Sequence, residues 1–187
     1  GKFKKSAFEV VSYGKKVAEQ LGSNLIALTI NANNNEELYV YGAEKVISVS
    51  NDSLATFNAK AYASVVKQVA DAQGSSIVIF DSSIDGLFIA PMMAVALDAG
   101  YASNVVALPS SMNPFTVKRK AFSSKAFSNT IISSDKKVIG VSKNSYGIHE
   151  NPVSGVTETF DAALSDADLG VTSVKVERIT GQVTIAD

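Results

Sequence analysis

The sequence predicts a three-layer α/β fold, in which a mainly parallel β-sheet carries helices on both faces. Segments with apolar residues at helical spacing alternate with short runs that are apolar throughout, and Gly22, Gly74 and Gly100 separate them. Continuous apolar runs suit strands that are buried on both faces, and their alternation with helices indicates βαβ units. Closely spaced strand patterns after Phe115 predict a β-rich C-terminal portion.

The elements of the α/β portion follow from the pattern in order. Ala7, Val10, Val17 and Leu21 belong to one helical stripe, which Gly22 ends. Next come a strand over residues 25–30, a polar loop over 31–35, a short helix over 36–41 and a strand over 45–49. A second cycle gives a helix over residues 62–72, a strand over 77–80, a loop over 81–86, a helix over 87–99 that Pro91 bends, and a strand over 105–108.

The β-rich portion begins with a predicted hairpin. Its strands are expected over residues 115–122 and 126–133, with the turn at 123–125. Further strands are expected over residues 137–142, 155–160 and 174–179, and the acidic stretch 161–168 is expected to be a surface connection. A length of 187 residues suits one hydrophobic core, so residues 1–187 are expected to form a single α/β domain.

The order of the elements predicts one strand more than the sequence contains. A helix comes first, although in doubly wound sheets the first strand usually lies centrally. Losing a central strand would remove roughly three to five buried apolar side chains, each contributing about 1.5–3 kcal/mol. This loss rivals the whole stability of a domain, about 5–15 kcal/mol. We therefore expect the natural protein to have a strand before Gly1, beside the strand at residues 25–30.

Composition excludes several classes of function. Seventeen basic and 18 acidic residues give a formal net charge of −1, so no nucleic-acid partner is expected. The absence of cysteine excludes disulfides, thiolate nucleophiles and Cys-ligated metal centres. The longest apolar stretch, residues 87–97, is shorter than the roughly 20 residues of a membrane-spanning helix. It is interpreted as a buried helix, and no membrane insertion is expected.

Few residues carry a catalytic or ligand-binding pattern. His149 is the only histidine and lies in a polar run, so it is expected in a surface loop, and no catalytic or metal-binding residue is expected. Residues 81–86 follow a predicted strand and open a helix, which is where α/β sheets bind ligands. The simpler interpretation there is that Asp85 is a helix N-cap.

The hairpin carries four cations with no acidic residue among them: Lys118, Arg119, Lys120 and Lys125. A solvated hairpin is the simpler interpretation of this cluster. The alternative is a docking surface for another domain.

Four segments, in order, resemble electron transfer flavoprotein α subunits. Residues 1–9 resemble the segment that follows the family's first strand, and residues 41–46 resemble its Tyr-Gly-Ala-Asp-Lys-Val motif. Residues 85–91 are similar to the family's helix start ending in Ala-Pro, and residues 119–126 to its Arg-Pro-x-Tyr-x-Gly-x-Ala hairpin. This chain departs from the pattern at Lys120, Ser124 and Met92, where the family usually has proline, glycine and arginine.

The resemblance implies a Rossmann-like domain of the adenine nucleotide α-hydrolase-like kind, part of an electron carrier rather than an enzyme. The carrier would be an αβ heterodimer with the β subunit, taking electrons from acyl-CoA dehydrogenase or other dehydrogenases and passing them to a quinone oxidoreductase. In this family FAD is held mainly by a C-terminal domain, which is expected to be absent from this chain. FAD is therefore expected in the full-length protein, with no FAD-binding residue among residues 1–187. The implied location is the bacterial cytoplasm, or the mitochondrial matrix in a eukaryote.

The resulting hypothesis is a scaffold domain that places the flavin domain against the partner subunit. Arg119, Phe122 and Lys125 are the interface candidates. One alternative is a stand-alone nucleotide-binding domain of the universal stress type, with residues 81–86 as its ligand loop. A second is a hydrolase with Ser82 or Ser83 as nucleophile, although no G-x-S-x-G motif surrounds either residue.

Overall fold

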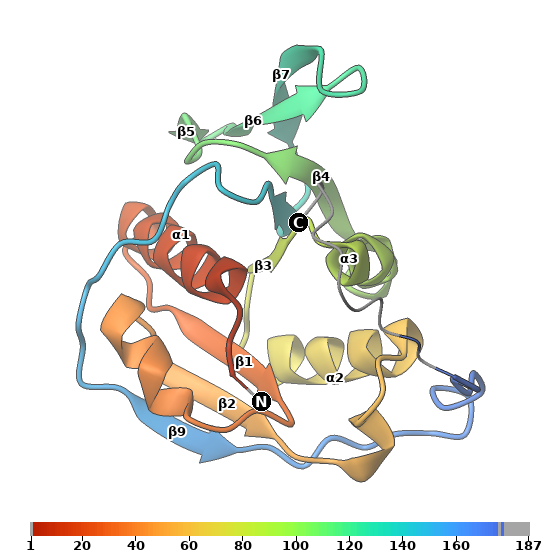
Figure 1. Ribbon diagram of the computed structural model, residues 1–187. Coiled ribbons are helices and arrows are strands. Elements are labelled where there is room, and N and C mark those ends of the chain that lie inside the picture. The colour runs from red at the N-terminus through yellow and green to blue at the C-terminus, as the bar shows by residue number, and fades with distance from the viewer. Residues whose placement is uncertain (1, 176, 178–187) are drawn as a thin grey trace.

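A computed structural model describes residues 2–175 and 177, and its strands form two sheets flanked by helices (Figure 1). The helices are α1 (Lys5–Leu21), α2 (Ala59–Ala72) and α3 (Ile84–Ala96), with two short 3₁₀ helices, η1 (Asn35–Tyr41) and η2 (Asp52–Leu54). The strands are β1 (Ile26–Ile30), β2 (Lys45–Val49), β3 (Ile77–Asp81), β4 (Ala99–Val105), β5 (Ser111–Met112), β6 (Phe115–Ala121), β7 (Ala126–Ile132), β8 (Lys136–Val141) and β9 (Val156–Thr159). The predicted α/β class is confirmed.

The first sheet is parallel, in the order β1-β2-β9. Ile26 pairs with Lys45 at the start of the β1–β2 ladder, and Lys45 pairs in turn with Val156 of β9. Strand β9 thus brings the C-terminal part of the chain back beside its N-terminal strands.

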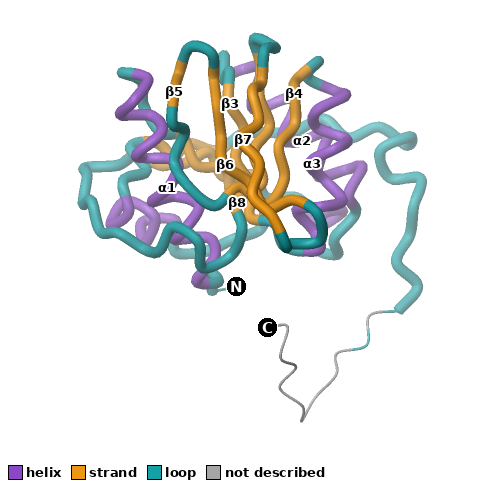
Figure 2. Tube along the Cα trace, turned by 90° about the horizontal axis from the view of Figure 1, so that it is seen from above, coloured by secondary structure: helices purple, strands orange, loops and turns teal. Residues whose placement is uncertain are grey.

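The second sheet is mixed, in the order β3-β8-β4-β6-β5, with β7 paired to β6. Strands β3, β8 and β4 run parallel, whereas β6 is antiparallel to β4 and to β7. Figure 1 shows the β6–β7 hairpin at one end of the molecule, beyond the helices, and Figure 2 shows it from above.

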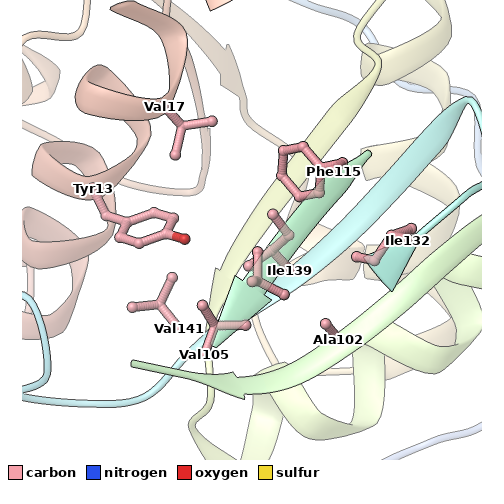
Figure 3. Close-up of a cluster of buried hydrophobic side chains, with 9 residues drawn as sticks. Tyr13, Val17, Ala102, Val105, Phe115, Ile132, Ile139 and Val141 are labelled. Atoms are coloured by element: carbon pink, nitrogen blue, oxygen red, sulfur yellow. The ribbon is translucent and has the colours of Figure 1, made fainter. Parts of the chain in front are cut away.

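Two layers of helix cover opposite faces of the strands. Tyr13 and Val17 of α1 pack against Ile139 and Val141 of β8 and against Val105 of β4 (Figure 3). On the other face, α2 and α3 pack against β8 and β3 in a cluster formed by Ala63, Val66, Ala70, Ile89, Ala90, Met93, Leu97 and Val138. The alternation of Val138 and Ile139 between these clusters is the period-two pattern of a strand covered on both faces.

Two predicted elements around α3 differ from the structure. The helix begins at Ile84 rather than at residue 87, because the Ser83 hydroxyl accepts a hydrogen bond from the Gly86 N–H and caps the helix. The next strand covers Ala99–Val105 rather than residues 105–108, because Asp98 adopts φ +52° and turns the chain directly out of the helix. Pro91 consequently lies inside α3 rather than in its first turns.

The remaining predictions concern the chain ends. The strand expected at residues 174–179 falls largely outside the described residues. Within the described part of the chain, β1 pairs only with β2, and β3 pairs only with β8. No helix among the described residues has the length and apolar character needed to cross a membrane.

Candidate docking interface

The β6–β7 hairpin has one buried face and one exposed face. Its antiparallel ladder runs from the Phe115–Ile132 pair to the Ala121–Ala126 pair. Phe115, Val117 and Ile132 lie in the core, whereas Phe127 is 61% exposed. Because side chains alternate along a strand, Lys118 and Lys120 share the outer face with Phe127 and Ile131.

Two lysines lie over exposed aromatic rings on this hairpin. Lys118 Nζ is 4.7 Å from the centre of the Phe127 ring, and Lys125 Nζ is 6.0 Å from the centre of the Phe122 ring. Phe122, at the tip, is 79% exposed. We call Lys118, Phe122, Lys125, Phe127 and Ile131 the hairpin surface. It combines exposed aromatic and apolar side chains, which are enriched at protein interfaces, with two lysines, which are not.

The turn that presents Phe122 has an uncommon backbone. Phe122, Ser123 and Ser124 have φ angles of 50°, 50° and 63°, so three consecutive non-glycine residues are left-handed. The Lys125 N–H donates to the Phe122 carbonyl oxygen at 3.0 Å and closes the turn. Ser124 occupies the position where the hairpin pattern usually has glycine, the residue that adopts this conformation at least cost.

Arg119 differs from the other two interface candidates. It lies on the same face of β6 as Phe115 and Val117, and its guanidinium Nε and Nη2 donate to the carbonyl oxygen and the hydroxyl of Ser103 at 2.9 and 3.0 Å. Ser103 lies on β4 where its ladder with β8 is irregular. Arg119 therefore ties the hairpin to the sheet, whereas Phe122 and Lys125 are exposed.

Residues 81–86 form a closed cap rather than an open ligand loop. Ser83 Oγ donates to Asp81 Oδ1 at 2.7 Å and accepts from the Gly86 N–H, so Ser83, not Asp85 as expected, is the N-cap. Ser82 Oγ accepts from the Asn104 N–H at 3.2 Å. The Asp81 carboxylate beside the cap opposes phosphate binding, which leaves the nucleotide-binding alternative without support from this loop.

The loop that contains His149 is anchored to α1 by a buried carboxylate. His149 is exposed, as expected, and its Nε2 is 3.1 Å from the Tyr146 carbonyl oxygen. The hydroxyls of Ser82 and Ser83 bond to Asn104, Asp81 and Gly86 instead of His149. Glu9 accepts backbone N–H groups from Asn144, Tyr146 and Gly147. Burial alone would raise the pKa of Glu9, but these backbone donors more than offset it and hold the pKa below its ordinary value.

A second exposed apolar surface was missed by the sequence interpretation. Helix α3 buries Gly86, Ile89, Ala90 and Met93, but the expectation of a wholly buried helix is wrong. Its outer side exposes Ile84, Leu87, Phe88, Met92 and Val95. The nearly uniform apolar composition of this segment was the available signal, since it distinguishes no inner face from an outer one.

One cavity among the described residues offers no cationic side chain for the diphosphate of a flavin dinucleotide. The main cavity, about 530 Å³, is lined by α1, α2, β1 and β3 and has no charged side chain in its wall. A dinucleotide needs donors or cations for its diphosphate. Within residues 2–175 and 177, no group of three or more His, Asp or Glu side chains could hold a metal ion.

The sequence matches the profile of a known family, described as "Electron transfer flavoprotein domain", over residues 1–167. This chain belongs to the electron transfer flavoprotein domain family. It is 26% identical over 176 residues to the electron transfer flavoprotein subunit alpha of Bacillus subtilis (strain 168), covering 89% of this chain and 52% of that protein. It is 24% identical over 192 residues to the subunit of the same name from Clostridium acetobutylicum, covering 100% of this chain and 53% of that protein.

A third relative has a different name. The acryloyl-CoA reductase electron transfer subunit beta of Anaerotignum propionicum is 29% identical over 118 residues, 62% of this chain and 32% of that protein. The resemblance of this electron transfer flavoprotein domain to α subunits is confirmed by the first two relatives. The chain spans about half the length of those relatives.

Proposed function

We propose that this chain is the scaffold domain of a flavin electron carrier and that the hairpin surface docks a β subunit. The observation that carries the proposal is the pairing of exposed aromatic rings with lysines at the end of the molecule where β6 and β7 project (Figure 1). Exposed aromatic residues in a polar or cationic rim are the side chains that dominate binding energy at protein interfaces.

The three interface candidates have different roles in this proposal. Phe122 and Lys125 contact the partner directly, because both are exposed at the hairpin tip. Arg119 is a positioning residue, since its bonds to Ser103 fix the angle of the hairpin against β4. A rigid hairpin lowers the conformational entropy that docking would otherwise cost.

In the complete carrier, residues 1–187 form one domain and FAD is bound by polypeptide outside it. The support is that this chain spans about half the length of its α-subunit relatives and that the cavity of about 530 Å³ has no charged side chain in its wall. The carrier takes electrons from dehydrogenases such as acyl-CoA dehydrogenase and delivers them to a quinone-linked acceptor. It acts as a carrier rather than an enzyme, in the cytoplasm of a bacterium, since the relatives described above are bacterial.

The test compares two phenylalanines of equal exposure on different surfaces. Phe127 on the hairpin surface and Phe88 on α3 are 61% and 62% exposed. In the full-length α chain, Phe127→Ser should weaken association with the β subunit at least about tenfold, or about 1.4 kcal/mol, whereas Phe88→Ser should not change it. Isothermal titration calorimetry measures both affinities. The reverse result would move the interface to α3 and contradict the proposal.

The lysines give a second readout. Replacing Lys118 and Lys125 by Gln should reduce the association rate and its dependence on ionic strength while changing the dissociation rate less, because exposed charges mainly steer encounter. A salt dependence equal to that of the wild-type protein would show that these lysines do not face the partner.

A further inference from the structure

A second cavity, of about 370 Å³, lies where β4 and β8 end. Its wall includes residues 106–107, which directly follow β4, and residues 143–145, which follow β8. The rest of the wall comes from the β6–β7 hairpin, through Lys118, Lys120 and Phe127. β4 and β8 are parallel neighbours, and the carboxyl ends of parallel strands are where open α/β sheets bind ligands.

The wall of this cavity carries three positive charges and no negative one. Lys118, Lys120 and Lys143 line it, and no Asp or Glu does, so we call it the lysine pocket. Among the described residues, none of the three lysines forms a salt bridge. Glu9 bonds to the wall at the Asn144 N–H, at 2.8 Å, but both of its carboxylate oxygens accept backbone N–H groups. Its charge is therefore shared with backbone donors rather than with a lysine.

Two of the lysines are held in place before any ligand binds. Lys120 Nζ donates to the hydroxyl of the buried Ser142 at 3.1 Å, and Lys118 Nζ lies 4.7 Å from the centre of the Phe127 ring. The Val106 N–H donates to the Lys118 carbonyl oxygen at 2.9 Å, which fixes the hairpin against the end of β4. Side chains that are already positioned lose less conformational entropy when they bind an anion.

The charge and the size of the lysine pocket indicate a phosphate that is carried on a larger molecule. A phosphate monoester has a charge of about −1.5 to −2 at neutral pH, which matches three ammonium groups better than the single charge of a carboxylate does. Lysine binds phosphate as a point charge. A volume of about 370 Å³ falls in the range of small-molecule sites, roughly 300–1,000 Å³. Val106, Ala107 and Phe127 supply apolar surface for the remainder of such a molecule.

We propose that the lysine pocket binds a small phosphate monoester, with its phosphate among the three lysines and its apolar body against Val106 and Phe127. Binding relieves the repulsion between three like charges that the fold holds around one cavity. The hairpin surface shares Lys118 and Phe127 with the pocket, but Lys120 and Lys143 belong to the pocket alone. The ligand site can therefore be tested apart from the docking of a β subunit.

Isothermal titration calorimetry of the full-length α chain with phenyl phosphate tests the proposal. Lys120→Gln and Lys143→Gln should each weaken the affinity at least about tenfold, because each removes a charge from the pocket. Lys60→Gln is the matched control, since Lys60 is exposed on α2 outside the pocket wall, and it should leave the affinity unchanged. Phenol, which lacks the phosphate, should not bind, and inorganic phosphate should bind more weakly than phenyl phosphate.

Each other outcome overturns the proposal. An equal loss of affinity in all three variants would show attraction to net charge alone, and no loss in any of them would place the ligand elsewhere. Phenol that binds as tightly as phenyl phosphate would exclude an anion site, and inorganic phosphate that does so would contradict a ligand with an apolar body. A peptide of Glu residues that binds more tightly, and only with Lys120 and Lys143 intact, would assign the pocket to an acidic protein segment.

The two pocket variants differ in their structural risk. Lys120→Gln loses the bond to Ser142, whereas the Lys143 side chain makes no hydrogen bond within the described part of the chain. If Lys120→Gln does not fold, as measured by circular dichroism, Lys143→Gln decides alone. An affinity equal to that of the wild-type protein in Lys143→Gln then contradicts the proposal.

Discussion

Replacing Glu9 by Gln should detach the loop around Tyr146 from α1. Glu9 is 4% exposed, and its Oε1 accepts the N–H groups of Tyr146 and Gly147, each at 2.9 Å. Its Oε2 accepts the N–H of Asn144 at 2.8 Å. Glutamine keeps one acceptor oxygen, so its amide nitrogen would face the Asn144 N–H as a second donor.

The size of the effect follows from these three bonds. A hydrogen bond to a charged group contributes about 1.5–3 kcal/mol, and a buried donor left without a partner costs about 1–3 kcal/mol. Glu9→Gln loses the charge and leaves one donor unpaired, so it should lower the free energy of unfolding by about 2–3 kcal/mol. Glu9→Ala leaves all three donors unpaired and should cost about 3–5 kcal/mol.

The loss of unfolding free energy caused by Glu9→Gln should depend on pH. The folded state holds the pKa of Glu9 below its ordinary value, because backbone donors outweigh the burial that would raise it. A group with a lowered folded-state pKa contributes stability that is complete above its unfolded pKa, about 4.3 for Glu. That contribution is lost as pH falls through the folded pKa, so the wild-type protein should approach the variant in stability on acidification.

Urea unfolding of the full-length proteins at several pH values measures the difference in unfolding free energy between the wild-type protein and Glu9→Gln. Faster hydrogen exchange at residues 142–151 would show that the loss of stability lies in this loop. Glu150→Gln is the matched control, since Glu150 is exposed in the same loop and should change stability by less than about 0.5 kcal/mol. A Glu9→Gln deficit that is below about 0.5 kcal/mol at pH 7, or constant from pH 7 to pH 3, would refute the reasoning.

Three further substitutions test the packing. Gly86→Ala would place a Cβ in steric clash with the Asp81 carbonyl oxygen, so it should destabilise the domain by at least about 2 kcal/mol in thermal unfolding. A smaller loss would show that the backbone of the cap shifts easily. Met93→Ala should lower the free energy of unfolding by about 2–5 kcal/mol, because Met93 is fully buried. Val95→Ala on the same helix should lower it by less than about 0.5 kcal/mol, because Val95 is 84% exposed. Equal losses of stability would contradict the orientation of α3. Tyr13→Phe removes the hydroxyl that donates to the Ala107 carbonyl oxygen at 3.1 Å and should cost about 0.5–1.5 kcal/mol in urea unfolding, with no loss indicating that water replaces the bond.

Sequence patterns located the elements that have a strong apolar signal. β1, β2 and β3 are apolar runs, and the structure places them close to the predicted residues. β4 was misplaced because Ala99–Val105 contains few large apolar side chains. Its position is fixed by the turn at Asp98, by pairing with β8 and by the irregularity near Asn104, all of which depend on tertiary structure.

The candidate interface was only partly accessible from sequence. The alternation along β6 contained enough information to place Arg119 on the inner face with Val117, once the register of the hairpin was known. The N-cap could not be chosen from composition, because Ser83 and Asp85 are both good capping residues and only the backbone N–H of Gly86 decides between them. The uniform apolar composition of α3 could not show which side is exposed, since an apolar helix has no polar face from which to infer its orientation.

The return of β9 to β2 has a consequence for biosynthesis. Lys45 and Val156 are neighbours in the ladder although most of the domain separates them in sequence. A nascent chain therefore exposes the outer edge of β2 to other polypeptides until residue 159 has left the ribosome. Pairing between segments so distant in sequence also slows folding, because the loop-closure entropy is lost before the contact forms.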